Sequence, residues 1–158
     1  MVSYRALVVA VLLVALLVVA AAPAAAPTRA GWSKAANSVC AIENTQVRAL
    51  PKVTSRTFLA DLAAIAKYAT RAVNRLAAIP RPPTEAQPIA SMVEKIRAQN
   101  KLVLGTAVPA AQHGDAATTN HVMAQVGKLG DQANAIARRL GAATCAANPT
   151  PSGTSLAA

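Results

Sequence analysis

Aromatic residues, acidic residues and histidines are all scarce in this chain of 158 residues. It contains one tryptophan, one phenylalanine, two tyrosines and two histidines, and six Asp and Glu against 16 Lys and Arg. A core with so few rings, built instead from alanine, leucine, isoleucine and valine, packs better between helices than between the faces of a sheet. The composition therefore predicts an all-α protein.

The few acidic residues and histidines also restrict metal chemistry. Ferritin-like di-iron bundles need Glu-x-x-His pairs, and none of Glu43, Glu85 and Glu94 begins one. His113 and His121 lie eight positions apart, which does not make a ligand pair on one helix face, and there is no Cys-x-x-Cys-His haem attachment motif. The sequence therefore predicts no metal site and no cofactor, and it leaves open a single histidine ligand to a dissociable haem.

Motifs for catalysis are missing as well. Neither histidine belongs to a nucleophile motif, and no glycine-rich phosphate loop is present. We therefore expect no catalytic residues and no enzymatic activity.

One long hydrophobic run dominates the start of the chain. Ala6 to Ala22 consists of 17 residues of alanine, valine and leucine, after Arg5 and before a segment of small residues. This order is typical of a secretory signal peptide, over residues 1–24, with cleavage before Ala25. The alternative is an uncleaved membrane anchor, since 17 helical residues span about 25 Å of a hydrocarbon core about 30 Å thick. Either way, the rest of the chain is expected to be extracytoplasmic, secreted in the first case and membrane-anchored in the second.

The exported part is strongly basic. The whole chain has a net charge of +10, and without Arg5 there remain 15 Lys and Arg against six Asp and Glu, a net of +9. Outside the cytoplasm this charge favours an anionic envelope polymer or a phospholipid surface as partner, whereas nucleic acid is not expected. The alternative interpretation is a charged surface that serves only solubility.

Apolar residues at helical spacing predict four helices. The clearest runs from Phe58 to Ile79, with apolar residues at alternating steps of four and three, and Thr54 or Ser55 can cap it. The others are expected at 33–50, at about 84 to 108 or 112, and at about 116–140. The apolar positions of the Phe58–Ile79 helix are Phe58, Leu62, Ile65, Ala69, Ala72, Leu76 and Ile79.

Capping signals mark the ends of these helices. Thr84, with Gln87 three residues later, predicts a capping box, and Asp115 and Gly141 predict the first cap and the stop of the last helix. Gly105 and Pro109 leave open whether the third helix ends near 108 or bends and continues. Residues 25–32 are expected to be a linker, 33–145 one domain and 146–158 a disordered tail.

The two cysteines are expected to pair. Four helices with short connections predict an up-down-up-down four-helix bundle, which brings the end of the fourth helix back to the start of the first. Cys40 lies early in the first helix and Cys145 follows the fourth. In an oxidising compartment these residues can form a disulfide, while an intermolecular bridge or two free thiols are the alternatives.

Five basic residues form a candidate surface for anionic partners. They lie at helical spacing on the second and third predicted helices: Lys67, Arg71, Arg75, Arg97 and Lys101. The alternative is a solvated face without a partner.

The order of these parts resembles uncharacterised exported helical-bundle proteins of high-GC actinobacteria. The resemblance rests on Ser38-Val39-Cys40, Ile79-Pro80, Arg139-Leu140-Gly141 and Thr144-Cys145, after a signal sequence. It implies a fold and export but no biochemical role. The two-cysteine plan is also similar to that of small exported haem-binding proteins of mycobacteria, although their other motifs are not placed in this chain.

These observations together predict a non-catalytic exported bundle. We expect a binding or structural component of the cell envelope with a basic face. The alternatives are a carrier of a small apolar or haem-like ligand in the bundle core, and a membrane-anchored single-pass protein with an extracytoplasmic bundle.

Overall fold

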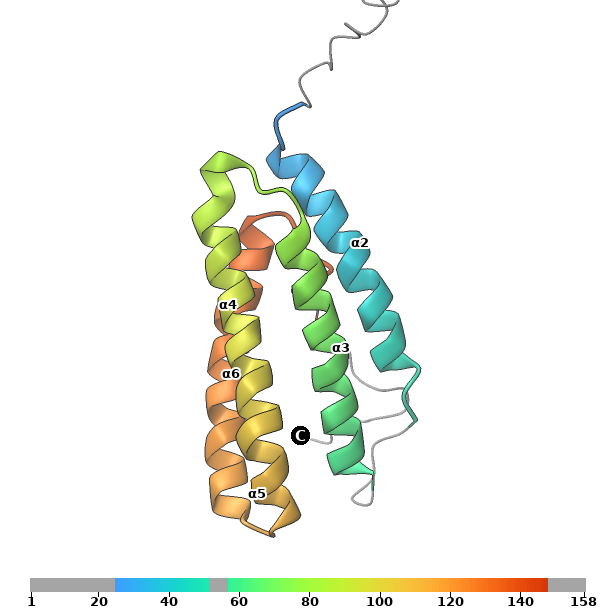
Figure 1. Ribbon diagram of the computed structural model, residues 1–158, viewed down its shortest axis with the longest axis vertical. Helices are drawn as coiled ribbons and strands as arrows, with labels where there is room; N and C mark the ends of the chain where they lie inside the picture. Colours follow the sequence, from blue (N-terminus) through green and yellow to red (C-terminus); the bar gives the residue numbers. More distant parts are fainter. Residues whose placement is uncertain (1–24, 52–56, 148–158) are drawn as a thin grey trace, which may run out of the picture.

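Helices make up the part of the chain that the computed structural model describes, which is residues 25–51 and 57–147. Within it lie α2 (Arg29–Arg48), α3 (Phe58–Ala78), a third helix that starts as α4 (Ala86–Leu102), and α6 (Ala116–Arg139). Successive helices run in alternating directions (Figure 1). These residues contain no strand, so the all-α prediction is confirmed for them.

Several predictions concern residues outside the described ranges. They are the hydrophobic run Ala6 to Ala22, the caps Thr54 and Ser55, and the predicted tail 146–158 except for its first two residues. Among the helices that are described, none combines the length and the hydropathy needed to cross a membrane.

The first helix begins earlier than the sequence predicted. α2 starts at Arg29, so the proposed linker 25–32 is too long by four residues. The reason is a local cap: the Thr28 side chain accepts a hydrogen bond from the amide of Gly31 at 3.1 Å, which satisfies one of the free donors of the first turn.

Prolines separate α3 from α4. Ile79 is already extended, with ψ of 127°, ahead of Pro80. The predicted capping box at Thr84 is wrong, because a 3₁₀ turn, η1 (Pro83–Glu85), comes first and α4 starts without a side-chain cap. The amide of Glu85 donates to the carbonyl of Pro82 at 3.0 Å, which tightens the turn.

The third helix continues past Pro109. After α4 the chain passes through a π-helical segment, η2 (Val103–Ala107), and then α5 (Val108–Gln112). A proline inside an α-helix lacks an amide donor and its ring clashes with the carbonyl four residues earlier, here Gly105. The wider π turn relieves this conflict. Of the two alternatives, the continuation to residue 112 is therefore observed.

The last helix has the predicted ends. The Asp115 side chain accepts from the amide of Thr118 at 2.9 Å, and this bond to the ionised carboxylate holds the pKa of Asp115 below its ordinary value of 3.8. The cap is therefore intact at neutral pH and is lost only as the pH falls through that lowered value. At the other end, Gly141 has φ of 80°, a conformation that glycine adopts without strain.

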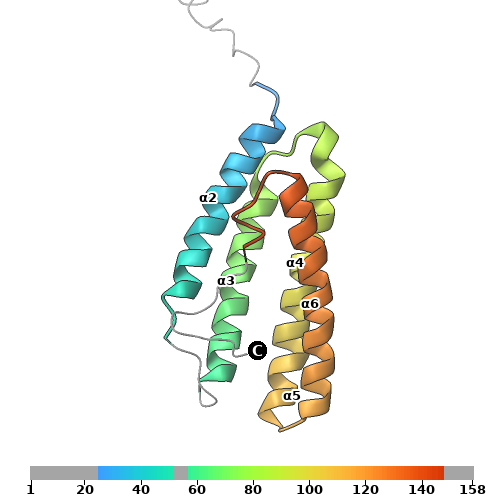
Figure 2. The same ribbon diagram turned by 180° about the vertical axis from the view of Figure 1, so that it is seen from behind.

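The helices pack in sequence order, with α2 on α3, α3 on α4 and α4 on α6. The pair α2 and α6 is not among the closely packed neighbours. Figure 2 shows the chain after α6 turning back into the space between these two helices. The core formed in this way includes Trp32, Leu76, Ile89, Met92, Val93 and Ile136.

Candidate functional site

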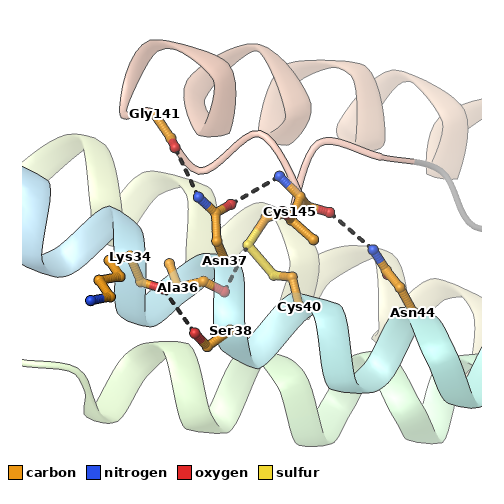
Figure 3. Close-up of a disulfide and its surroundings, with 9 residues drawn as sticks. Lys34, Ala36, Asn37, Ser38, Cys40, Asn44, Gly141 and Cys145 are labelled. Carbon is orange, nitrogen blue, oxygen red and sulfur yellow. Dashed lines mark hydrogen bonds between the residues drawn. A yellow bond between two sulfur atoms is a disulfide. The ribbon is translucent and has the colours of Figure 1, made fainter.

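The disulfide between Cys40 and Cys145 ties the segment after α6 to α2. The Sγ–Sγ distance is 2.04 Å and the bond joins residues 105 positions apart. The predicted pairing is therefore confirmed. Figure 3 shows the bridge between α2 and the returning chain.

Two asparagines of α2 fix the backbone of the same segment (Figure 3). The Asn37 side chain donates to the carbonyl of Gly141 at 3.1 Å and accepts from the amide of Thr144 at 2.9 Å. The Asn44 side chain donates to the carbonyl of Thr144 at 3.0 Å. Residues 141–145 therefore form a well-anchored wall between α2 and α6.

Below this wall the helices enclose a cavity of about 360 Å³, which we call the interior cavity. Residues from all four helices and from the returning chain line it, and it is partly open to solvent. Most of its lining is apolar. The residues used below are Leu62, Ile65, Ala69 and Ala72 of α3, Val103 of η2, and Val126 and Ala133 of α6.

The interior cavity exists because small side chains occupy positions that point inward. The apolar positions predicted for the Phe58–Ile79 helix are only partly buried in α3. Phe58 is 40% exposed, and the exposure of Leu62, Ile65, Ala69 and Ala72 is intermediate between buried and exposed. The last four line the interior cavity. The side chains of Ala69 and Ala72 are too short to reach α6, so the space between the helices stays open.

A glutamine crosses one wall of the interior cavity. The Gln99 side chain on α4 donates to the carbonyl of Val126 on α6 at 2.9 Å. It passes over Gly130, where a Cβ would lie only 2.8 Å from its amide nitrogen. Gly130 therefore allows this side chain to approach α6 closely, whereas a Cβ at Gly127 would meet no atom within 4 Å.

A buried carboxylate with two arginines forms the most strongly charged part of the lining. Glu43 is 4% exposed, and its two oxygens lie 3.5 Å from Nη2 of Arg71 and 3.4 Å from Nη1 of Arg75. The Gln46 side chain also accepts from Arg71. Because a buried carboxylate needs compensation, these two contacts explain how Glu43 is tolerated in the apolar side of α2.

The five predicted basic residues are all exposed, but they do not share one environment. Arg71 and Arg75 turn toward α2 and Glu43. Arg97 and Lys101 line a shallow groove between α3 and α4, and Lys67 precedes Arg71 by one turn. Glu94 is exposed one turn before Arg97 on α4.

Histidines and acidic residues do not gather into a metal site in the part of the chain that is described. His113 lies in the turn after α5, and His121 is exposed on α6, with Nε2 2.9 Å from the side-chain nitrogen of Gln125. Neither lines the interior cavity, although Met123 does.

Sequence reasoning missed the Glu43 cluster and the interior cavity. In the sequence, Glu43 stands among the apolar positions of the first predicted helix. An acid in that position implies a cation on the helix packed against it, and Arg71 and Arg75 on the next helix supply two. For the interior cavity, the signal in the sequence is the pair of alanines, Ala69 and Ala72, among the apolar positions of the Phe58–Ile79 helix.

Comparison of the chain with protein-family models, with curated proteins and with solved structures finds no match.

Proposed function

We propose that this protein is a non-catalytic binding protein, an up-down-up-down four-helix bundle that carries a small apolar ligand in the interior cavity. The interior cavity itself is the observation that supports the proposal. Its volume of about 360 Å³ falls within the range of roughly 300 to 1,000 Å³ typical of ligand sites, and an apolar lining with a few polar groups is typical as well.

We also propose that the protein acts outside the cytoplasm. The Cys40–Cys145 disulfide supports this, because such bonds persist mainly in oxidising compartments. The run Ala6 to Ala22 supports export through a signal peptide, or membrane attachment where the run is not removed.

The volume favours a small ligand over a haem-like one. A cavity of about 150 Å³ holds one benzene molecule, so by proportion the interior cavity holds roughly 14 non-hydrogen atoms. A porphyrin macrocycle exceeds this number. The lining also contains neither His113 nor His121, so a haem there would lack a histidine ligand from the described residues.

Filling the interior cavity is expected to weaken ligand binding strongly. Ala69→Leu together with Ala72→Leu places six additional carbon atoms where the ligand lies, so the affinity for decanol should fall at least tenfold. Stability should not fall, because the new side chains occupy existing space. Isothermal titration of decanol into the folded variant measures the first effect, and urea denaturation measures the second.

Ala124→Leu is the matched control, since this alanine lies in the middle of α6 and is exposed. It should bind decanol as the unaltered protein does. Equal affinities for all three proteins, or no decanol binding by the unaltered protein, would overturn the proposal of an apolar ligand site.

A second function is supported by the exposed basic side chains of α3 and α4. The five residues Lys67, Arg71, Arg75, Arg97 and Lys101 carry a charge of +5, which Glu43 and Glu94 reduce to +3. Such a surface can adhere to an anionic envelope polymer or phospholipid surface.

Reversal of three of these charges tests adhesion without disturbing Glu43. The variant Lys67→Glu, Arg97→Glu, Lys101→Glu should lose retention on vesicles containing anionic phospholipid, and salt should weaken the retention of the unaltered protein. Retention that is insensitive to both the substitutions and salt would exclude the basic face as an adhesive surface.

A further inference from the structure

We infer that the ligand of the interior cavity is a single-chain amphiphile with an anionic head, whose chain enters the cavity and whose head is bound by Arg71 and Arg75. This inference rests on the proposed function and specifies its ligand class. It joins two features of the structure, the apolar lining and the paired arginines beside it.

The two arginines lie next to the lining of the interior cavity. Glu43 and Tyr68 both line it. The Glu43 oxygens are 3.5 and 3.4 Å from the nearest guanidinium nitrogens of Arg71 and Arg75, and Cζ of Arg71 lies 4.6 Å from the centre of the Tyr68 ring. A head group that emerges beside Tyr68 and Glu43 therefore meets both guanidinium groups.

The two arginines are only partly neutralised by Glu43. Two guanidinium groups share a single carboxylate, so the cluster of Glu43, Arg71 and Arg75 retains a net charge of +1. The two arginine side chains are 47% and 52% exposed. A guanidinium carries five N–H donors in a planar fork that suits carboxylate and phosphate oxygens, and one nitrogen of each arginine contacts Glu43.

The contacts to Glu43 are also long. Hydrogen bonds between a cationic nitrogen and a carboxylate oxygen usually measure about 2.7–2.9 Å, whereas these measure 3.5 and 3.4 Å. Nη2 of Arg71 also donates to the Gln46 side chain, so the contacts to Glu43 and Gln46 involve one nitrogen of Arg71 and one of Arg75. Glu43 lies within reach of both guanidinium groups and therefore competes with the anionic head for them.

The volume of the interior cavity restricts the ligand to one chain. Roughly 14 non-hydrogen atoms by proportion to a benzene-sized cavity correspond to one medium-length chain with its head group. A phospholipid with two long chains does not fit into this space.

Two probes with the same chain separate the head group from the chain. Decanoate and decanol are titrated into the native, disulfide-bonded protein at neutral pH, where decanoate is ionised, and decyltrimethylammonium serves as the cationic comparison. The protein should bind decanoate up to about fivefold more tightly than decanol, since one half-exposed charge pair contributes up to about fivefold. The cationic probe should bind least tightly.

Substitutions then assign the preference to the arginines. Glu43→Gln removes the competing charge, so it should widen the preference for decanoate severalfold while decanol affinity stays constant. The triple variant E43Q/R71Q/R75Q should bind both probes equally. It leaves no buried charge behind, so its folding is preserved and can be verified by circular dichroism and by its unchanged decanol affinity.

The double variant R97Q/K101Q is the matched control, because it removes two exposed basic residues of α4 away from Glu43. It should keep the preference for decanoate. Equal binding of the two probes by both the unaltered protein and E43Q would overturn this inference and leave the proposed function standing. A loss of preference in R97Q/K101Q as large as in the triple variant would also overturn it. Failure of both probes to bind would instead contradict the proposed function.

Discussion

Replacement of Cys40 and Cys145 by alanine is expected to lower the free energy of unfolding by about 2–4 kcal/mol. The disulfide closes a loop between residues 105 positions apart, for which the chain-entropy model gives about 4.7 kcal/mol. Measured losses usually fall below that figure. The bridge also holds the wall between α2 and α6, where direct packing of the two helices is sparse, so its loss should open the interior cavity as well.

Urea denaturation of the double variant measures this loss. Reduction of the unaltered protein should reproduce it, and the intact mass should rise by two hydrogen atoms on reduction. The same mass spectrum reports whether the mature chain starts near Ala25. Equal stability of the double variant and the unaltered protein would show that the bridge does not determine the stability of the bundle.

Replacement of Arg71 and Arg75 by glutamine, with Glu43 retained, is expected to lower the free energy of unfolding by roughly 2 kcal/mol. Removal of the partners of a buried charge usually costs about 3–5 kcal/mol. We expect a smaller loss of roughly 2 kcal/mol here, because both arginines are about half exposed and solvent screens their interaction with Glu43. The carboxylate of Glu43 would remain 95% buried with neutral amides as its only partners.

The triple variant E43Q/R71Q/R75Q should recover most of this stability, because it removes the uncompensated charge together with its partners. Thermal or urea denaturation of the three proteins gives the comparison. A double variant as stable as the unaltered protein, or a triple variant no more stable than the double one, would mean that the two arginines do not compensate Glu43.

Local signals in the sequence predicted the helix ends where one residue determines the backbone. Asp115 accepts a hydrogen bond from an amide of the first turn, and Gly141 takes positive φ at the end. Both effects depend on neighbouring residues only. The pairing of Cys40 with Cys145 could also be predicted, since only two cysteines exist and alternating helices bring them to the same end.

Other features depend on contacts that a single sequence does not display. The capping box at Thr84 failed because Pro82 and Pro83 favour a 3₁₀ turn before α4 begins. The interior cavity depends on the distance between helices, which the spacing of apolar residues in the sequence does not determine. The apolar positions of α3 show the same spacing whether its alanines contact a neighbouring helix or line a cavity.

The ion pairs of Glu43 could be predicted only in part. The position of Glu43 in the apolar side of the first helix was evident, and so was the spacing of Arg71 and Arg75 on the second. Only the packing of α2 on α3 shows that they meet. This contact changes the interpretation of the basic residues, since two of the five are partly neutralised by a buried acid.

The proposal that the interior cavity holds a ligand can be tested by methyl chemical shifts measured during titration with decanol. The proposal predicts progressive shifts for Leu62, Ile65, Val103 and Val126, which line the interior cavity from three elements. The methyl groups of Ile42 and Leu104, which are 51% and 39% exposed on the outside of the bundle, should not move. Shifts confined to Ile42 and Leu104, with unchanged signals from the lining, would contradict the claim.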